Sequence, residues 1–166
     1  MKLRSFVGVL ALLPPTALLC GGCGFRLAGG EPLPAVMAKP YLSVQDSYTD
    51  FSREFERRLK GSGVQLQPRA TDASATVEVT RDDVQRRVLS VSASNIPTEY
   101  ELTYTVTIAV HAGGKEVLTP QTLSLSRDYS FDENTLLAKE NEEDVLRVQM
   151  ARDLAAIATR RLTSLK

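Results

Sequence analysis

The sequence predicts an α+β domain in which about four mostly antiparallel strands form one layer and two helices cover one face of the sheet. Two patterns predict this fold: long segments in which apolar and polar residues alternate, and two apolar stripes at helical spacing that flank them. A sheet with one apolar face and one threonine-rich face needs a cover on its apolar side only. We therefore expect a two-layer sandwich whose other sheet face is in water.

Residues 1–22 have the organisation of a secretory signal peptide. Two basic residues precede an apolar run over residues 6–19, and small residues stand before Cys23. The run is shorter than the roughly 20 residues that cross a bilayer as a helix. Two glycines directly before Cys23 suit cleavage by a lipoprotein signal peptidase, although Cys20 stands where Leu is usual. We expect the mature chain to begin at an acylated Cys23.

Acylation of Cys23 would fix the chain to a membrane. Each buried methylene contributes about 0.8 kcal/mol, so several acyl chains would make the anchor effectively permanent. The next residue is Gly24, not an Asp that would suggest retention in the inner membrane. We expect attachment to the periplasmic leaflet of the outer membrane. The alternative is a simply secreted protein with a free or disulfide-linked Cys23.

The mature chain is expected to hold one domain. Residues 28–40 contain two adjacent glycines and three prolines, which favour neither sheet nor helix. We predict an extended tether there, so that residues 23–40 form the lipidated N-terminus and tether, and residues 41–166 form a single α+β domain. A domain of this size can bury a core without disulfides.

The domain begins with a short strand and a helix. Residues 41–45 alternate weakly and predict the first strand. Thr49 or Asp50 can cap a helix over residues 51–60. Its apolar stripe consists of Phe51, Phe55 and Leu59. Residues 64–67 suggest another short strand before a proline.

Three longer strands are predicted in the middle of the chain. The first spans about 75–91, and its apolar residues change parity near Asp82–Asp83, as a β-bulge would cause. The second, about 99–110, alternates most clearly, and a hairpin turn at 111–115 leads to the third, about 116–131. The apolar face of the second strand consists of Tyr100, Leu102, Tyr104, Val106, Ile108 and Val110. That of the third consists of Leu123, Leu125, Tyr129 and Phe131.

The C-terminal part predicts a helix. A short helical turn is expected at 135–139, and Asn141 followed by three acidic residues predicts a new helix start. The apolar stripe of this helix consists of Leu146, Met150, Leu154, Ile157, Leu162 and Leu165.

Charge and motifs exclude several classes of function. Removing residues 1–22 leaves 18 basic against 20 acidic side chains, which gives no reason to expect a nucleic-acid partner. The single histidine, His111, lies beside a glycine turn, where a solvated residue is expected. No nucleophile elbow, phosphate-binding glycine loop or HExxH motif is present. We therefore predict neither an enzyme nor a metal or cofactor site.

Basic residues are the remaining candidates for ligand binding. Arg86 and Arg87 lie in a predicted strand, and Lys115 ends a hairpin. The simplest explanation is that these basic residues lie on a solvent-exposed surface and bind no ligand. The functional hypothesis is that they bind phosphates of an anionic glycolipid, for which arginine offers bidentate contacts.

Two stretches resemble the LptE family of lipopolysaccharide-assembly lipoproteins. Residues 23–27, Cys-Gly-Phe-Arg-Leu, resemble the family's mature N-terminus. Residues 139–162, from Lys-Glu-Asn-Glu-Glu to Arg-Arg-Leu, are similar to its terminal helix. The order of strands and helices also fits from Tyr41 onward.

The resemblance implies a function that composition alone does not. LptE-like proteins plug the lumen of the outer-membrane β-barrel LptD, assist its assembly and bind lipopolysaccharide on its way to the cell surface. It implies Cys23 as the lipid site, and makes Arg86, Arg87 and Lys115 hypothetical lipopolysaccharide contacts. Two alternatives stay open: a free-standing outer-membrane lipoprotein that carries an amphiphile, and a hydrolase that depends on His111.

Overall fold

The computed structural model describes residues 32–130 and 136–165, so the signal peptide, Cys23 and Phe131 lie outside the described residues. For residues 136–141 only the helical backbone is described. In chain order the elements are η1 (Ala35–Met37), β1 (Pro40–Val44), α1 (Asp50–Gly61), η2 (Ala70–Asp72), β2 (Ala75–Val91), β3 (Pro97–Ala112), β4 (Lys115–Ser130) and α2 (Leu136–Thr163).

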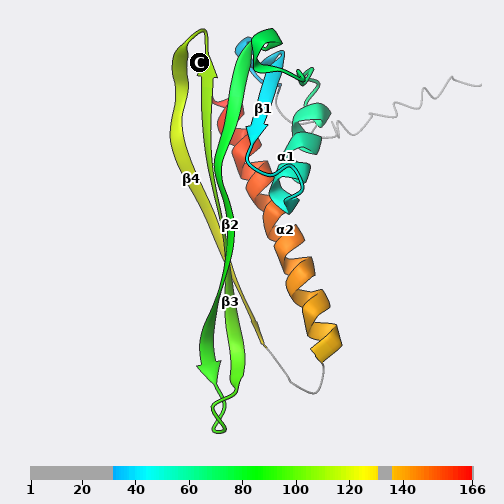
Figure 1. The fold of residues 1–166 in the computed structure, drawn as a ribbon, viewed down its shortest axis with the longest axis vertical. Helices are drawn as coiled ribbons and strands as arrows, with labels where there is room; N and C mark the ends of the chain where they lie inside the picture. Colours follow the sequence, from blue (N-terminus) through cyan, green and yellow to red (C-terminus); the bar gives the residue numbers. More distant parts are fainter. Residues whose placement is uncertain (1–31, 131–135, 166) are drawn as a thin grey trace, which may run out of the picture.

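The four strands form one mixed sheet in the order β1-β2-β3-β4. Strand β1 is parallel to β2, and the other two pairs are antiparallel. Helices α1 and α2 lie on the same side of the sheet, and the long β2–β3 hairpin points away from the end that holds the C-terminus (Figure 1). The predicted α+β arrangement of one sheet and two helices is confirmed.

The core lies between the sheet and the helices. The alternation predicted for β3 is confirmed, since Leu102, Tyr104, Val106, Ile108 and Val110 are at most 1% exposed. Helix α2 contributes both predicted large residues and alanines that the stripe did not include. Its fully buried residues are Met150, Ala151, Leu154, Ala155, Ala158 and Leu162.

Two bulges keep apolar side chains on the core face. In β2 the register shifts between Val79 and Arg81, slightly before the predicted position at Asp82–Asp83. The shift must come earlier because Asp82 already faces the core side, opposite Val106. In β4 the pairing shifts at residues 119–120, which brings Leu118 into the core with Leu123 and Leu125.

The strand predicted at residues 64–67 is wrong. The segment is extended but is not part of the sheet. Two of its N–H groups donate to backbone carbonyls near the start of β1: Gln65 to Ala38 at 3.0 Å and Gln67 to Pro40 at 2.8 Å. Pro68 follows and has no N–H to donate, so the pairing ends there.

The described part of the expected tether packs against the domain. Residues 32–40 include the short helix η1, whose Met37 is fully buried, and Leu33 and Val36 pack against the same core. The prolines interrupt regular structure as expected, but the apolar residues between them are buried. Pro40 is already the first residue of β1.

The helix start predicted at Asn141 is wrong. Helix α2 runs without a break from Leu136, so the expected turn and the expected helix form one element. The acids after Asn141 therefore do not lie in the first turn of α2. Glu143 instead forms an ion pair with Arg86, and Asp144 forms one with Arg147.

A polar cluster fixes the start of α1 on the sheet. Thr49 caps the helix, as one of the two predicted capping residues: its hydroxyl accepts from the Ser52 N–H at 3.1 Å and donates to Asp82 at 2.5 Å. The Tyr104 hydroxyl accepts from the Phe51 N–H at 3.1 Å and donates to Asp82 at 2.9 Å. Burial, followed by the charge of Asp82, raises the pKa of Tyr104.

A second contact joins α1 to α2. The Arg147 guanidinium donates to Asp50 at 2.8 Å, and Arg53 pairs with the same carboxylate at 2.8 Å. Burial of Asp50 opposes its ionisation, but Arg147 and Arg53 together lower its pKa. The two helices are therefore held together by charge as well as by apolar packing.

We expect Tyr104→Phe to lower the free energy of unfolding by about 1–3 kcal/mol, because the Phe51 N–H and Asp82 each lose a buried partner. The ring and its packing stay. Chemical denaturation measures the loss, with Tyr48→Phe as the matched control because Tyr48 is 82% exposed. Equal stability of the two variants would contradict the structural role of the Tyr104 hydroxyl.

Candidate functional site

Arg86 lies on the helix side of the sheet and contacts α2. Its guanidinium donates to the Glu143 carboxylate at 3.0 Å and stands 5.0 Å from the centre of the Tyr100 ring. The Tyr129 hydroxyl donates to the same carboxylate at 2.5 Å, and its ring stacks on Tyr100. The four side chains form a cluster that joins β2, β3 and β4 to α2; we call it the Arg86 cluster.

The Arg86 cluster favours the ionised form of its acid. Burial opposes ionisation of Glu143, but the hydrogen bonds from Tyr129 and Arg86 outweigh it and lower the pKa of Glu143. Burial, together with the hydrogen bond to Glu143, raises the pKa of Tyr129 to about 12. Hydrogen bonds with Tyr129 and Glu143 raise the pKa of Arg86. At neutral pH the cluster is therefore a hydrogen-bonded ion pair with a neutral tyrosine.

We expect the stability advantage of the wild-type chain over Glu143→Gln to depend on pH. The folded-state pKa lies below the ordinary value of 4.5, so the charge of Glu143 stabilises the fold above that pH and its contribution is lost as the pH falls further. The effect should stay below about 1 kcal/mol, because the Arg86 side chain is half-exposed. Denaturation at pH 7 and pH 3 measures it, and a difference between the two proteins that is the same at both pH values would contradict it.

The three basic residues proposed as glycolipid contacts do not converge on one site. Arg86 pairs with Leu102 on the helix side, whereas Arg87 is on the opposite face and pairs with Glu101 at 3.0 Å. Lys115 lies at the β3–β4 turn, opposite Ala112. Along β3, the distance from Leu102 to Ala112 corresponds to about 33 Å of extended strand. A single phosphate group cannot be held by all three residues.

The sheet face turned away from the helices carries a row of hydroxyl pairs. Three cross-strand hydrogen bonds of 2.9–3.0 Å link β3 to β4. The pairs are Thr103 with Ser126, Thr105 with Ser124, and Thr107 with Thr122. We call this surface the hydroxyl face. Because each hydroxyl already has a protein partner, the surface can meet either water or another polar surface without leaving a buried group unpaired.

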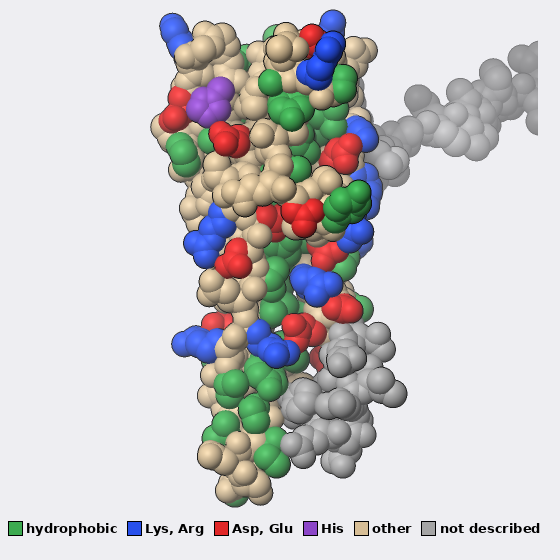
Figure 2. All heavy atoms as spheres, in the orientation of Figure 1, with side chains coloured by type: hydrophobic (Ala, Val, Ile, Leu, Met, Phe, Trp, Pro, Cys, Tyr) green, Lys and Arg blue, Asp and Glu red, His purple; other side chains and the backbone are tan. Residues whose placement is uncertain are grey.

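Among the described residues, exposed apolar side chains form two groups of near neighbours, whereas Tyr48 and Val117 are exposed singly. Val88, Leu89 and Val91, near the end of β2, are 42–51% exposed. Figure 2 shows apolar side chains gathered at the lower end of the molecule, over the β2–β3 hairpin, and charged side chains only above them. On α2, Val145 and Val148 are 54% and 40% exposed and line a shallow hollow with Arg152.

His111 lies at the surface, as predicted. Its Nε2 atom is 3.6 Å from the Glu78 carboxylate, and both side chains are more than 40% exposed. Among the described residues, no group of three or more His, Cys, Asp or Glu side chains could hold a metal ion. No helix within the described ranges is both long enough and apolar enough to span a membrane.

Comparisons with known proteins agree on one family. Residues 40–162 match the LptE family, described as lipopolysaccharide assembly. The LPS-assembly lipoprotein LptE of Pectobacterium atrosepticum is 26% identical over 99% of this chain and 88% of its own length. The LPS-assembly lipoprotein LptE of Yersinia enterocolitica is 29% identical over 89% of this chain and 71% of its own length.

Solved structures share the fold. The rare lipoprotein B of Shewanella oneidensis has a TM-score of 0.66 and 31% identity, and the match covers 76% of this chain and 94% of that one. A minor lipoprotein of Acinetobacter baumannii has a TM-score of 0.66 and 27% identity, over 79% and 94% of the two chains. The family match covers most of the chain, including both helices and all four strands. The chain therefore belongs to the LptE family of lipopolysaccharide-assembly lipoproteins.

Proposed function

We propose that this protein is a non-catalytic subunit of the outer-membrane lipopolysaccharide translocon. In this proposal an acylated Cys23 anchors it to the periplasmic leaflet of the outer membrane. The domain then plugs the lumen of an LptD-like β-barrel, assists assembly of that barrel and binds lipopolysaccharide during its delivery to the cell surface. Membership of the lipopolysaccharide-assembly family is the observation that carries the proposal.

The hydroxyl face supports a position inside a polar lumen. The interior of an outer-membrane barrel is polar, and hydroxyl pairs such as Thr105 with Ser124 would face it without burying a lone charge. Two arginines on the same face have partners of opposite sign: Arg87 pairs with Glu101 and Arg81 with Asp83. A surface of this kind can be covered by a polar wall at little desolvation cost.

Crosslinking tests this placement. A photoreactive amino acid at position 105, in the middle of the hydroxyl face, should join the protein to a large β-barrel when outer membranes are irradiated. A sample kept in the dark is the control for specificity. If positions 103, 105 and 107 all yield no adduct with a barrel while the protein remains in the outer membrane, the hydroxyl face does not contact the lumen.

We expect Arg87→Ala and Lys115→Ala each to weaken lipopolysaccharide binding by about threefold to tenfold, the loss of one charge-assisted contact at an exposed site. Arg57→Ala, an exposed arginine on α1, is the matched control. Binding of purified lipopolysaccharide measures the effect. If each variant binds as tightly as the control variant does, these side chains do not contact lipopolysaccharide.

Arg86 needs a different test because it belongs to the Arg86 cluster. Arg86→Ala would break the ion pair with Glu143, so a loss of binding could follow from displacement of α2. Arg86→Lys keeps the charge but loses the bidentate geometry. A binding defect in Arg86→Lys at unchanged thermal stability would assign the residue to lipopolysaccharide recognition. Unchanged binding would make its role structural.

A further inference from the structure

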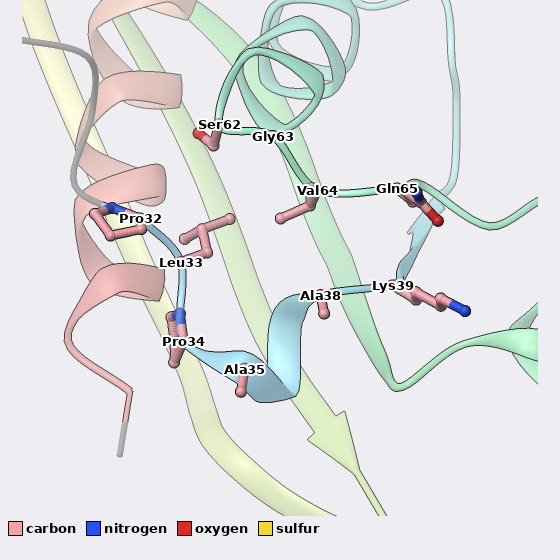
Figure 3. A pocket seen from close by; sticks show the side chains of 10 residues that line it. All are labelled: Pro32, Leu33, Pro34, Ala35, Ala38, Lys39, Ser62, Gly63, Val64 and Gln65. Carbon is pink, nitrogen blue, oxygen red and sulfur yellow. The ribbon is translucent and has the colours of Figure 1, made fainter.

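A pocket lies where the described chain begins. It is hollowed between the segment that precedes β1 and the loop that follows α1, and its volume is about 440 Å³. Leu33 and Val64 point toward one another across it, and Ala35 and Ala38 form its lower wall in the view of Figure 3. Lys39 lies at one end, beside Gln65. Most of the lining is therefore apolar, with a polar end.

Hydrogen bonds hold the walls of this pocket in place. The Gln65 N–H donates to the Ala38 carbonyl at 3.0 Å, which ties the two walls together. The Ser74 hydroxyl donates to the Val36 carbonyl at 2.7 Å and accepts from the Lys39 N–H at 3.1 Å. Because the backbone of both walls is tied in this way, the pocket is a formed feature of the domain.

The chain itself offers an occupant. Pro32, the first described residue, is one of the lining residues, so the described part of the chain begins at the wall of the pocket. Two apolar side chains, Phe25 and Leu27, lie seven and five residues before it. Extended chain covers about 3.3–3.6 Å per residue, so both can reach a pocket that starts at Pro32.

The sequence between these residues and the pocket favours a reversal of direction. Gly29 and Gly30 lie between Leu27 and Pro32, and glycine adopts the positive φ angles that tight turns need. A short tether also sets an effective concentration of about the millimolar range. An apolar contact with a dissociation constant of about 1 mM is about half populated under that condition.

We propose that the segment before Pro32 folds back and that Phe25 and Leu27 occupy this pocket. Docking would hold residue 23, two residues before Phe25, close to the end of the domain that carries η1. A lipid anchor at that residue would then be held against the domain instead of at the end of a free tether. This inference concerns the chain alone and does not depend on the proposed partner barrel.

Tryptophan fluorescence tests the proposal, because the chain contains no tryptophan. The chain from residue 23 onward, with Cys23→Ser to keep it free of lipid, carries Phe25→Trp or Leu27→Trp as its one tryptophan, which is excited at a wavelength that the five tyrosines do not absorb. We expect blue-shifted emission and reduced quenching by acrylamide. Ala38→Arg, which puts a charged side chain at an exposed position of the pocket wall, should shift the emission to that of a solvated tryptophan.

Ala93→Arg is the matched control, because it makes the same change at an exposed position in the loop after β2 and should leave the emission unchanged. Circular dichroism of each variant shows whether the fold is kept. A solvated tryptophan at both positions would overturn the proposal and leave the pocket to the acyl chains of the anchor or another ligand. Protection that Ala38→Arg does not change, or that disappears on dilution, would also overturn it; the latter would indicate docking into a second copy.

Discussion

Leu154→Ala is expected to lower the free energy of unfolding by about 2–5 kcal/mol, the usual cost of a cavity at a buried leucine. Leu154 is fully buried on α2 and belongs to the core cluster together with Phe55 of α1 and Val106 of β3. The cavity would therefore lie where the helices meet the sheet. The surrounding side chains can fill it only in part, because they come from different elements.

Chemical denaturation of the folded domain measures this loss. Val145→Ala is the matched control, since Val145 lies on the same helix but is 54% exposed, and its substitution should cost no more than about 0.5 kcal/mol. A loss at Leu154 as small as that of the control would contradict the packing of α2 against the sheet. An intermediate loss with a lower denaturant slope would instead indicate a more compact denatured state.

Cys23→Ser is expected to abolish labelling of the protein with palmitate. The loss of label should be complete, because without the thiol no acyl chain can be attached. The burial of methylenes at about 0.8 kcal/mol each is then lost, so that only protein held by the barrel should remain in the outer-membrane fraction. Membrane fractionation on a density gradient, with labelled palmitate, measures both the position and the modification.

Cys20→Ser is the control for this substitution. Cys20 lies in the predicted signal peptide, so its variant should be labelled and should reach the outer membrane as the wild-type protein does. Labelling that is lost with Cys20→Ser and kept with Cys23→Ser would place the lipid on Cys20 and contradict the prediction. An unlabelled wild-type protein would contradict acylation altogether.

Much of the fold could be predicted because local pattern and burial agree. The alternation from Leu102 to Val110 is also the observed core face of β3, and Thr49 caps α1. The predictions that were wrong concern features that depend on contacts between distant segments. The bulge in β2 lies before Asp82 because that carboxylate accepts hydrogen bonds from Thr49 and Tyr104, which no local pattern reveals.

The predicted start of α2 was wrong for a related reason. Asn141 and the acids after it have the composition of a helix start, but Glu143 is bound by Tyr129 and Arg86 of the sheet. Composition does not distinguish an acid that caps a helix from one that pairs across to a strand. The contacts within the Arg86 cluster were therefore found only from the structure.

The separation of the basic residues could have been anticipated. Arg86 and Arg87 are adjacent in a strand, and successive side chains of a strand point to opposite faces. Only the partners had to come from the structure: Glu143 for the first residue and Glu101 for the second. Lys115 could also be assigned to a remote turn, because the glycines before it predict the hairpin.

Purification of the full-length protein, with a C-terminal tag, from native outer membranes in mild detergent tests the proposed function most directly. We expect a stable complex with one large β-barrel protein of the LptD kind, and an intact mass for the tagged chain that corresponds to a mature start at an acylated Cys23. A lone monomer from the same membranes, correctly acylated and folded, would contradict the claim that this lipoprotein works inside a translocon.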